Sequence, residues 1–253
     1  MSDEMTIEDY LEQGGVLTSP GNAPPRYRAE LMRLMATFVD SEMAGASGFA
    51  DIITTAPGIT ERIAAARIVL EKFDHAERVL KIMGEFGANT EQYAKHHPWT
   101  SRLERNADIG ASRQGSDMRL SVFHYPIEGW IDAVVMNVLM GRAVRTQLEE
   151  FSHASYQPLA EAFRAILPRE IRHAELGEEG LRELLEDKSN KAVVQASVSY
   201  WWPRIAASFG TIGSEKFSSL KAIGIRHRSN EDLLADWEKD AGALMKELGL
   251  KAG

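Results

Sequence analysis

Four stretches of this sequence carry apolar residues at alternating steps of three and four, a spacing that restricts the chain to amphipathic helices with one buried face. The stretches begin near residues 31, 65, 130 and 159. The first consists of Leu31, Met35, Phe38, Glu42, Gly45 and Phe49. No run alternates between apolar and polar residues as a half-buried strand does. The sequence therefore predicts an all-α protein whose four main helices share one core.

Three of the four predicted inner faces contain ionisable side chains. Glu42 lies on the first face, Lys72 and His75 on the second, and Glu170 and His173 on the fourth. The last two residues are three positions apart, so they lie on the same side of one helical turn. Because an unpaired charge is very costly to bury, these groups must pair with one another or with an ion. We therefore expect one buried polar cluster between three helices.

The composition of this cluster is typical of a metal-binding helical bundle. A Glu-x-x-His pair on one helix, a His on a second and a Glu on a third make up most of the ligand set of a carboxylate-bridged di-iron centre in a ferritin-like bundle. The sequence has no cysteine, so any metal must be held by His and carboxylate side chains. A single Glu-x-x-His also occurs by chance in many helices, and a polar core network without metal is the alternative interpretation.

Two further features of the main segments fit such a bundle. The polar stretch from 88 to about 127 suits the long crossover connection of a ferritin-like fold. Gly45 on the first apolar stripe would allow a neighbouring helix to approach closely.

Pro168 is expected to kink or divide the fourth helix, because proline removes a backbone hydrogen bond.

The remaining segments predict one helical domain with a short lead-in. Residues 1–25 contain several turn-forming residues and are expected to be an irregular N-terminal lead-in, and residues 26–253 the ferritin-like domain. Additional C-terminal helices are expected over about 188–208, 214–222 and 230–249, the last capped by Ser229 and Asp232.

Charge and hydropathy exclude several classes of function. The formal net charge of -8 argues against a nucleic-acid partner, which would need a basic face. No apolar run approaches the ~20 residues that span a membrane. The first residues, 1–4, are acidic and lack the basic start and apolar core of a signal peptide. We therefore expect a cytoplasmic protein.

Short blocks spread over roughly residues 25 to 250 carry a family resemblance. They are Tyr27-Arg28, Ser41-Glu42, Ala56-Pro57, His75, Ser121-Val122-Phe123-His124-Tyr125-Pro126, Trp130, Asp132, Ser155-Tyr156-Gln157-Pro158, Glu170-x-x-His173, Tyr200-Trp201-Trp202-Pro203, Phe209-Gly210 and Asn230-Glu231-Asp232-Leu233. In these blocks the chain resembles the phenylacetyl-CoA epoxidase subunits of phenylacetic acid degradation, and the catalytic di-iron subunit more closely than the structural one.

The resemblance implies a cofactor, a substrate class and partners. The family's enzymes use a non-haem di-iron centre to activate O2 and epoxidise the aromatic ring of a CoA thioester. They work as complexes of ferritin-like subunits with a reductase. The resemblance therefore implies a homodimer or a heteromer with a second ferritin-like protein, and a CoA-thioester ligand.

The same resemblance places metal ligands at four residues of this chain and leaves two positions unmatched. The matching residues are Glu42, His75, Glu170 and His173. The family's other two carboxylate ligands fall on Lys72 and Gly141. Glu71 lies about 100° around the helix from Lys72, so we expect it in a surface ion pair rather than in the cluster.

A lysine in place of a carboxylate changes the expected chemistry. Two Fe(II) ions bring four positive charges, and a further ammonium a few ångströms away repels them by several kcal/mol, even at an effective dielectric constant of ~20. We therefore expect Lys72 to bridge Glu42 and Glu170 in place of metal, with one iron or none favoured over two. If Lys72 swings away, a single ion could be held by Glu42, His75, Glu170 and His173.

Two functional hypotheses follow. In the first, the chain is an epoxidase-like protein of aromatic catabolism with a degenerate di-iron site. In the second, it is an active oxygen-activating non-haem iron monooxygenase acting on a CoA thioester. Neither hypothesis assigns a catalytic residue.

Three further groups of residues are assigned by composition alone. The pair His96-His97 is expected in a solvated loop. Arg226-His227-Arg228 is expected in an exposed turn, with contact to the phosphates of a CoA-type ligand as the alternative. Trp201-Trp202 is expected in the core, where the indole N–H groups need acceptors.

Overall fold

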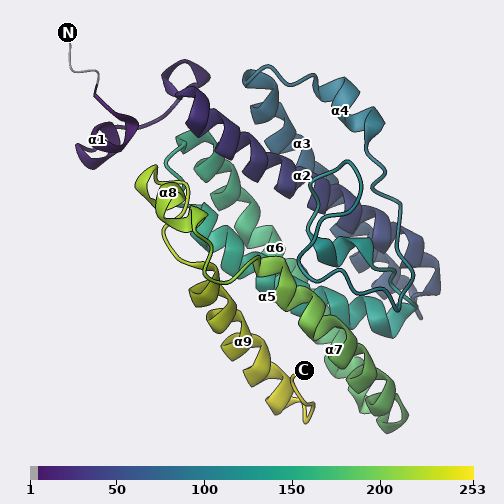
Figure 1. Ribbon diagram of the computed structural model, residues 1–253. Coiled ribbons are helices and arrows are strands. Elements are labelled where there is room, and N and C mark those ends of the chain that lie inside the picture. Colours follow the sequence, from purple (N-terminus) through teal and green to yellow (C-terminus); the bar gives the residue numbers. More distant parts are fainter. Residues whose placement is uncertain (1–4) are drawn as a thin grey trace.

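The computed structural model describes residues 5–253, and the regular structure in that range is helical, apart from one isolated bridge between Leu17 and Tyr156 (Figure 1). The helices of the described range are α1 (Ile7–Glu12), α2 (Pro25–Ile52), α3 (Ile59–Glu85), α4 (Thr90–His96), α5 (Trp130–Phe151), α6 (Gln157–Glu186), α7 (Lys191–Ala206), α8 (Lys216–Ala222) and α9 (Asn230–Glu247). The all-α prediction is confirmed.

Four long helices form the central bundle. α2 packs along α3, α5 packs along α6, and the two pairs meet through α3 with α6 and α2 with α5. The connection between the pairs runs from the end of α3 to the start of α5, and Figure 1 shows it passing across one side of the bundle. This packing is consistent with the predicted ferritin-like bundle.

The crossover connection is held to the bundle by a buried carboxylate. Asp40 on α2 accepts hydrogen bonds from the Tyr93 hydroxyl at 2.9 Å, the Trp99 indole at 3.1 Å and the Met118 backbone N–H at 2.6 Å. The connection also contains the short helix α4, which the polar composition did not predict. Its first turn is capped by Asn89, whose side chain accepts a hydrogen bond from the Gln92 backbone N–H.

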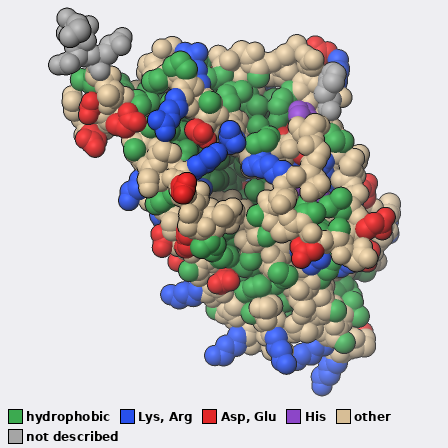
Figure 2. Space-filling model, in the orientation of Figure 1, with side chains coloured by type: hydrophobic (Ala, Val, Ile, Leu, Met, Phe, Trp, Pro, Cys, Tyr) green, Lys and Arg blue, Asp and Glu red, His purple; other side chains and the backbone are tan. Residues whose placement is uncertain are grey.

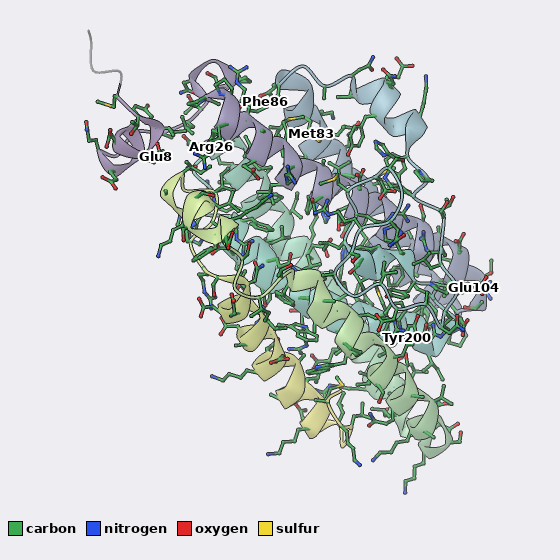
Figure 3. The ribbon with its side chains drawn as sticks, viewed as in Figure 1. Glu8, Arg26, Met83, Phe86, Glu104 and Tyr200 are labelled. Atoms are coloured by element: carbon green, nitrogen blue, oxygen red, sulfur yellow. The ribbon has the colours of Figure 1, made fainter. Side chains whose placement is uncertain are left out.

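The connection also contacts the C-terminal helices. Figure 3 shows Glu104 in the connection near Tyr200 on α7. The neighbouring Arg105 stacks on the Tyr200 ring, with its guanidinium carbon 3.8 Å from the ring centroid. The same arginine forms an ion pair at 2.8 Å with Asp132 at the start of α5. These contacts join the crossover, α5 and α7 at the end of the bundle opposite Phe86 (Figure 3).

The three C-terminal helices confirm the predicted additions to the bundle. α7 and α9 both pack on α5. Trp201 is fully buried and donates its indole N–H to Asp132 at 2.9 Å, and Trp202 packs on Trp237 of α9, as expected for core residues. The predicted cap of the last helix is also present, because Ser229 accepts a hydrogen bond from the Asp232 backbone N–H.

The structure decides between the two alternatives predicted for Pro168 only as far as helix division is concerned. Pro168 does not divide this helix, which continues as one element from Gln157 to Glu186. Pro168 lies on the exposed face. Because proline has no backbone N–H, the backbone carbonyl of Arg164, four residues earlier, lacks its helical hydrogen-bond donor. Arg164 is exposed, so water can hydrate this carbonyl.

The predicted lead-in contains some regular structure. Within it, α1 and a 3-10 turn over Pro20–Asn22 precede α2. Residues 1–4, on which the expected absence of a signal peptide was based, lie outside the described residues. The boundary at residue 25 stays a prediction. No helix in the described range has the length and apolarity needed to cross a membrane.

Candidate metal centre

Six ionisable side chains from three helices meet inside the bundle. They are Glu42 from α2, Glu71, Lys72 and His75 from α3, and Glu170 and His173 from α6. All of them except Glu71 are at most 6 % exposed. The structure thus brings together every residue that the sequence placed in the cluster, and it adds one.

The ammonium of Lys72 lies between two carboxylates that come from different helices. Its Nζ atom is 3.0 Å from Oε1 of Glu42, 3.1 Å from Oε1 of Glu170 and 3.2 Å from Oε2 of Glu170. These are hydrogen-bonding distances. The lysine therefore links α2, α3 and α6 through charge-assisted hydrogen bonds.

The imidazole of His75 binds the same two carboxylates. Its Nδ1 atom is 3.2 Å from Oε2 of Glu42 and 3.0 Å from Oε1 of Glu170. The other ring nitrogen, Nε2, is buried and has no hydrogen-bond partner among the described residues. His75 is thus oriented by the acids on one side and leaves an unsatisfied polar atom on the other.

The structure overturns the expectation for Glu71. Its Oε2 atom is 2.7 Å from Nε2 of His173, and its side chain is only 26 % exposed. Nδ1 of His173 in turn lies 3.3 Å from Oε1 of Glu170. Helix geometry correctly places Glu71 away from the inner stripe of α3. The neighbouring helix α6, however, brings His173 to that flank, and a sequence pattern within one helix cannot show such a contact.

Small residues on two helices make room for this arrangement. A Cβ atom at Gly45 would lie 3.7 Å from Cδ of Lys72 and 3.2 Å from the ring of Phe123. The glycine therefore leaves space on α2 for the alkyl chain of the lysine and for the crossover connection. The absence of a side chain at Gly45 thus accommodates the side chains of Lys72 and Phe123, and not the backbone of a neighbouring helix as predicted.

Gly141, the second unmatched position, lies at a close contact between α5 and α6. A Cβ atom there would be 2.9 Å from Cβ and 3.2 Å from Cα of Ala174, the residue after His173. Real Cβ atoms essentially never approach another atom so closely. A carboxylate side chain at this position would thus require α5 and α6 to separate or Ala174 to change.

The charges of the cluster perturb one another strongly. Burial lowers the pKa of Lys72, but the negative charges of Glu170 and Glu42 outweigh burial and raise it above its ordinary value. Burial likewise opposes the charged form of His75, yet its hydrogen bonds to the two acids raise its pKa to about 9. Burial raises the pKa of Glu170, and the Lys72 charge and the two histidines together lower it well below its usual range. Lys72, His75 and Glu170 are therefore all in their charged forms at neutral pH.

Part of the cluster also has the arrangement of a metal site. Glu42, His75 and Glu170 each offer one ligand atom, and these atoms lie within 4.8 Å of one another. Carboxylate oxygen with imidazole nitrogen suits Fe(II), Mn(II) or Zn(II). The buried carboxylate and histidine groups could therefore hold a metal ion.

A cavity that opens at the surface extends inward to one residue of the cluster. It has a volume of about 260 Å³, and Glu42 forms part of its wall. The wall also contains apolar side chains of several elements, among them Phe38, Phe123 and Met140. Figure 2 shows a hollow in this face of the molecule with Lys and Arg side chains around its rim. No sequence pattern predicts this cavity, because its wall is contributed by segments far apart in the chain.

Arg226 is one of the residues that the structure places differently from the sequence expectation. It lines the cavity, with its side chain only 16 % exposed and Nε 3.5 Å from Oε1 of Glu150. The expected exposed turn is therefore wrong for this residue. Glu150 also accepts hydrogen bonds from the backbone N–H groups of His227 and Arg228, which fixes the segment before α9.

The prediction of a solvated loop is also corrected for His97, whereas the His96 side chain lies outside the part of the chain that the structure describes. The ring of His97 lies between the rings of Tyr93 and Trp99, with centroid distances of 4.4 and 5.6 Å. Its Nδ1 atom is buried. The physical reason is the anchoring of Tyr93 and Trp99 by Asp40, which draws this part of the connection onto the bundle.

The fold and the cluster together define a ferritin-like helical bundle with a buried carboxylate–histidine centre. Comparison with known proteins then identifies the family: the chain belongs to the phenylacetic acid catabolic protein family, whose sequence pattern matches residues 16–252. The chain is also similar to one of the subunits of the 1,2-phenylacetyl-CoA epoxidase of Escherichia coli (strain K12). The two are 24 % identical over an alignment of 238 residues that covers 92 % of this chain and 72 % of the relative.

Proposed function

We propose that this chain is an epoxidase-like protein of phenylacetate-type aromatic catabolism, of the catalytic rather than the structural type, in which the ammonium of Lys72 stands where a metal pair would be. The observation that carries the proposal is the position of Nζ, 3.0 Å from Glu42 and 3.1 Å from Glu170 in a buried site. On this interpretation the di-iron site is degenerate.

Charge balance supports this proposal. Protonated Lys72 and His75 carry two positive charges, and the carboxylates of Glu42 and Glu170 carry two negative charges, so these four groups are neutral together without metal. Two Fe(II) ions would add four positive charges to a buried site of low polarisability. The remaining acid, Glu71, already binds His173. The residues present therefore do not fit a metal pair.

A single ion is the second candidate, and it corresponds to the alternative function as an oxygen-activating monooxygenase. Two observations support a single ion. The ligand atoms of Glu42, His75 and Glu170 lie close together, and the buried Nε2 atom of His75 has no hydrogen-bond partner among the described residues. For such an ion to bind, Lys72 would have to leave the two carboxylates and His75 would have to lose its proton. Both changes oppose binding at neutral pH.

Metal analysis after anaerobic loading with Fe(II) tests the proposal. We expect at most one iron per chain, and none that survives desalting in the presence of a weak chelator. About two irons per chain would overturn the assignment of Lys72, and one tightly held iron would favour the monooxygenase alternative. Loading of a di-iron protein of the same fold under the same conditions is the positive control.

The cavity supports a CoA thioester as the ligand of this protein. Arg33, Arg113 and Arg226 line it together with many apolar side chains. Burial and the neighbouring charge of Arg33 lower the pKa of Arg113, as expected where two cations lie close together. Glu30, 3.7 Å from Arg33, offsets only part of this charge. The volume of about 260 Å³ suits an acyl group in the interior. The phosphates of CoA would remain at the rim beside the arginines.

We expect Arg33→Ala and Arg113→Ala each to weaken binding of phenylacetyl-CoA by about tenfold, because each removes one charged contact of the phosphates. Isothermal titration calorimetry measures this directly. Arg172→Ala is the matched control, since Arg172 on α6 is 49 % exposed, comparable with 55 % for Arg33, and does not line the cavity. Equal affinities of all four proteins would contradict the proposed site.

A further inference from the structure

One polar side chain interrupts the apolar stripe that α5 contributes to the cavity wall. Met140, Val144, Gln147 and Phe151 follow one another at steps of four, three and four, and all of them line the cavity. Gln147 is the polar member of this stripe. Because an amide group is costly to remove from water without a hydrogen bond, a glutamine at this position needs a partner.

The described part of the chain does not supply that partner. The Nε2 atom of Gln147 is buried and has no hydrogen bond to any described residue. Two hydroxyl groups of the same wall, by contrast, are satisfied within the protein. Thr37 donates to the backbone carbonyl of Arg33 at 2.9 Å, and Ser208 donates to that of Ile205 at 2.6 Å. The unpaired amide therefore indicates an acceptor that a ligand brings into the cavity.

A glutamine can reach such an acceptor without movement of the helix. Its amide group carries two N–H donors. The terminal torsion of the side chain is soft, so the amide can turn from the wall toward the cavity. The donor that has no partner in the protein is thus available to a bound molecule.

The charges along this part of the wall favour a neutral acceptor over an anionic one. The guanidinium carbon of Arg226 is 5.4 Å from the centroid of the Phe151 ring, one turn beyond Gln147. The charge of Arg226 is already offset by Glu150, at 3.5 Å from Nε. A carbonyl oxygen needs a hydrogen-bond donor but no counter-charge. It therefore fits this position better than a carboxylate does.

We propose that Gln147 is a positioning residue for the acyl ligand, and that its amide N–H donates a hydrogen bond to the carbonyl oxygen of the thioester. This inference rests on the proposed function, which places a CoA thioester in the cavity. Gln147 lies six residues along α5 from Gly141, a distance of about 9 Å. A carbonyl held at Gln147 thus leaves room for an aromatic ring on the side of the cluster.

This hydrogen bond fixes how far the acyl group enters the cavity. The neighbouring members of the stripe, Met140, Val144 and Phe151, are apolar and make contacts without a preferred direction. A hydrogen bond is directional. A site built around such a bond discriminates against a ligand that lacks the acceptor, because the buried donor is then left unpaired.

Isothermal titration calorimetry with two ligands tests the role of Gln147. The ligands are phenylacetyl-CoA and the thioether analogue in which a methylene group replaces the carbonyl. We expect the natural protein to bind the thioester about tenfold more tightly. Gln147→Met, which nearly conserves volume but has no N–H donor, should lose this preference. Gln157→Met is the matched control and should keep it, because Gln157 is exposed and does not line the cavity.

Infrared spectroscopy of the bound thioester, with an isotope label in its carbonyl, gives a readout that a merely structural role would not change. A hydrogen bond lowers the stretching frequency of a carbonyl group. We expect a lower frequency in the natural protein and in Gln157→Met than in Gln147→Met. Thermal unfolding without ligand should show no loss of stability in Gln147→Met, because this variant breaks no hydrogen bond within the described protein. A marked loss would reveal a protein partner of the amide and overturn the inference.

The other outcomes separate this inference from the proposed function. Equal affinity of the natural protein for the two ligands, or the same carbonyl frequency with and without the amide, overturns the role of Gln147 and leaves the CoA thioester as the ligand. Tighter binding of free phenylacetate than of the thioester overturns the choice of a neutral carbonyl. Binding of neither CoA ligand overturns both the proposed ligand and this inference.

Discussion

Replacement of Lys72 by methionine is expected to lower the free energy of unfolding by about 3–5 kcal/mol, the largest effect that we predict for a single substitution. The substitution keeps the length of the side chain but removes the ammonium that binds Glu42 and Glu170. Two carboxylates then remain buried without the cation that lay between them. Urea denaturation of the metal-free protein measures the change.

The matched control is Lys81→Met on the same helix. Lys81 is 71 % exposed and forms only an i,i+4 ion pair with Glu77, so its removal should cost less than about 1 kcal/mol. A comparable loss in both variants would show that the Lys72 ion pairs do not stabilise the core.

The pH dependence of the same variant provides a second signature. In the natural protein the folded-state pKa of Glu170 is lowered from its ordinary 4.5, so its stabilising contribution is present above pH 4.5 and is lost as the pH falls below that value. Without the ammonium, burial favours protonation of the acids. The free energy of unfolding of the Lys72→Met variant should therefore increase as the pH falls from 7 to about 5. The natural protein should show no such gain from Glu170 in this range.

A triple variant, Lys72→Glu with Gly141→Asp and Ala174→Gly, is expected to raise iron binding from at most one ion to about two ions per chain. The first two substitutions supply carboxylates at the two unmatched family positions, which gives four acids to balance two Fe(II) ions. The third removes the methyl group that would lie 2.9 Å from a Cβ atom at residue 141. Metal analysis and the absorption spectrum after anaerobic loading measure the result.

The steric part of this design has its own control. Lys72→Glu with Gly141→Asp but with Ala174 retained should be less stable than the triple variant, because overpacking at a helix contact costs about 1–3 kcal/mol. If the triple variant folds and still binds no second iron, the equivalence of residues 72 and 141 with the family's ligand positions is wrong.

The inward positions of the bundle were predictable because helical periodicity fixes which side chains share a face. Glu42, Lys72, His75, Glu170 and His173 all lie where the three-and-four spacing places them, each at most 6 % exposed. The ion pairs that join them follow from the high cost of leaving a charge unpaired in a core. Helical periodicity and the cost of a buried charge are both independent of how the helices are arranged.

Contacts made at the flanks of helices were not predictable in this way. Glu71 reaches His173 because α6 crosses beside α3 at that level, and Arg226 lines the cavity because Glu150 fixes the segment before α9. The steric limit at Gly141 likewise depends on the approach of Ala174 from another helix. Each of these depends on the relative positions of two elements, which periodicity within one element does not contain.

The exposed apolar face of α3, with Ile59, Ile63, Leu70 and Phe73, shows a further limit of sequence patterns. Its heptad spacing is visible in the sequence, but the inner stripe of the same helix has nearly the same period. Only the structure shows which of the two apolar stripes is covered. α3 is therefore a helix with two apolar faces, one holding the cluster and one exposed at the surface.

The most direct test of the central claim is a crystal structure of protein soaked anaerobically in Fe(II), with anomalous data collected at the iron absorption edge. We predict density for the Lys72 ammonium between the carboxylates of Glu42 and Glu170, and no pair of anomalous peaks in the cluster. Two neighbouring iron peaks bridged by these carboxylates, with the lysine side chain displaced, would contradict the account.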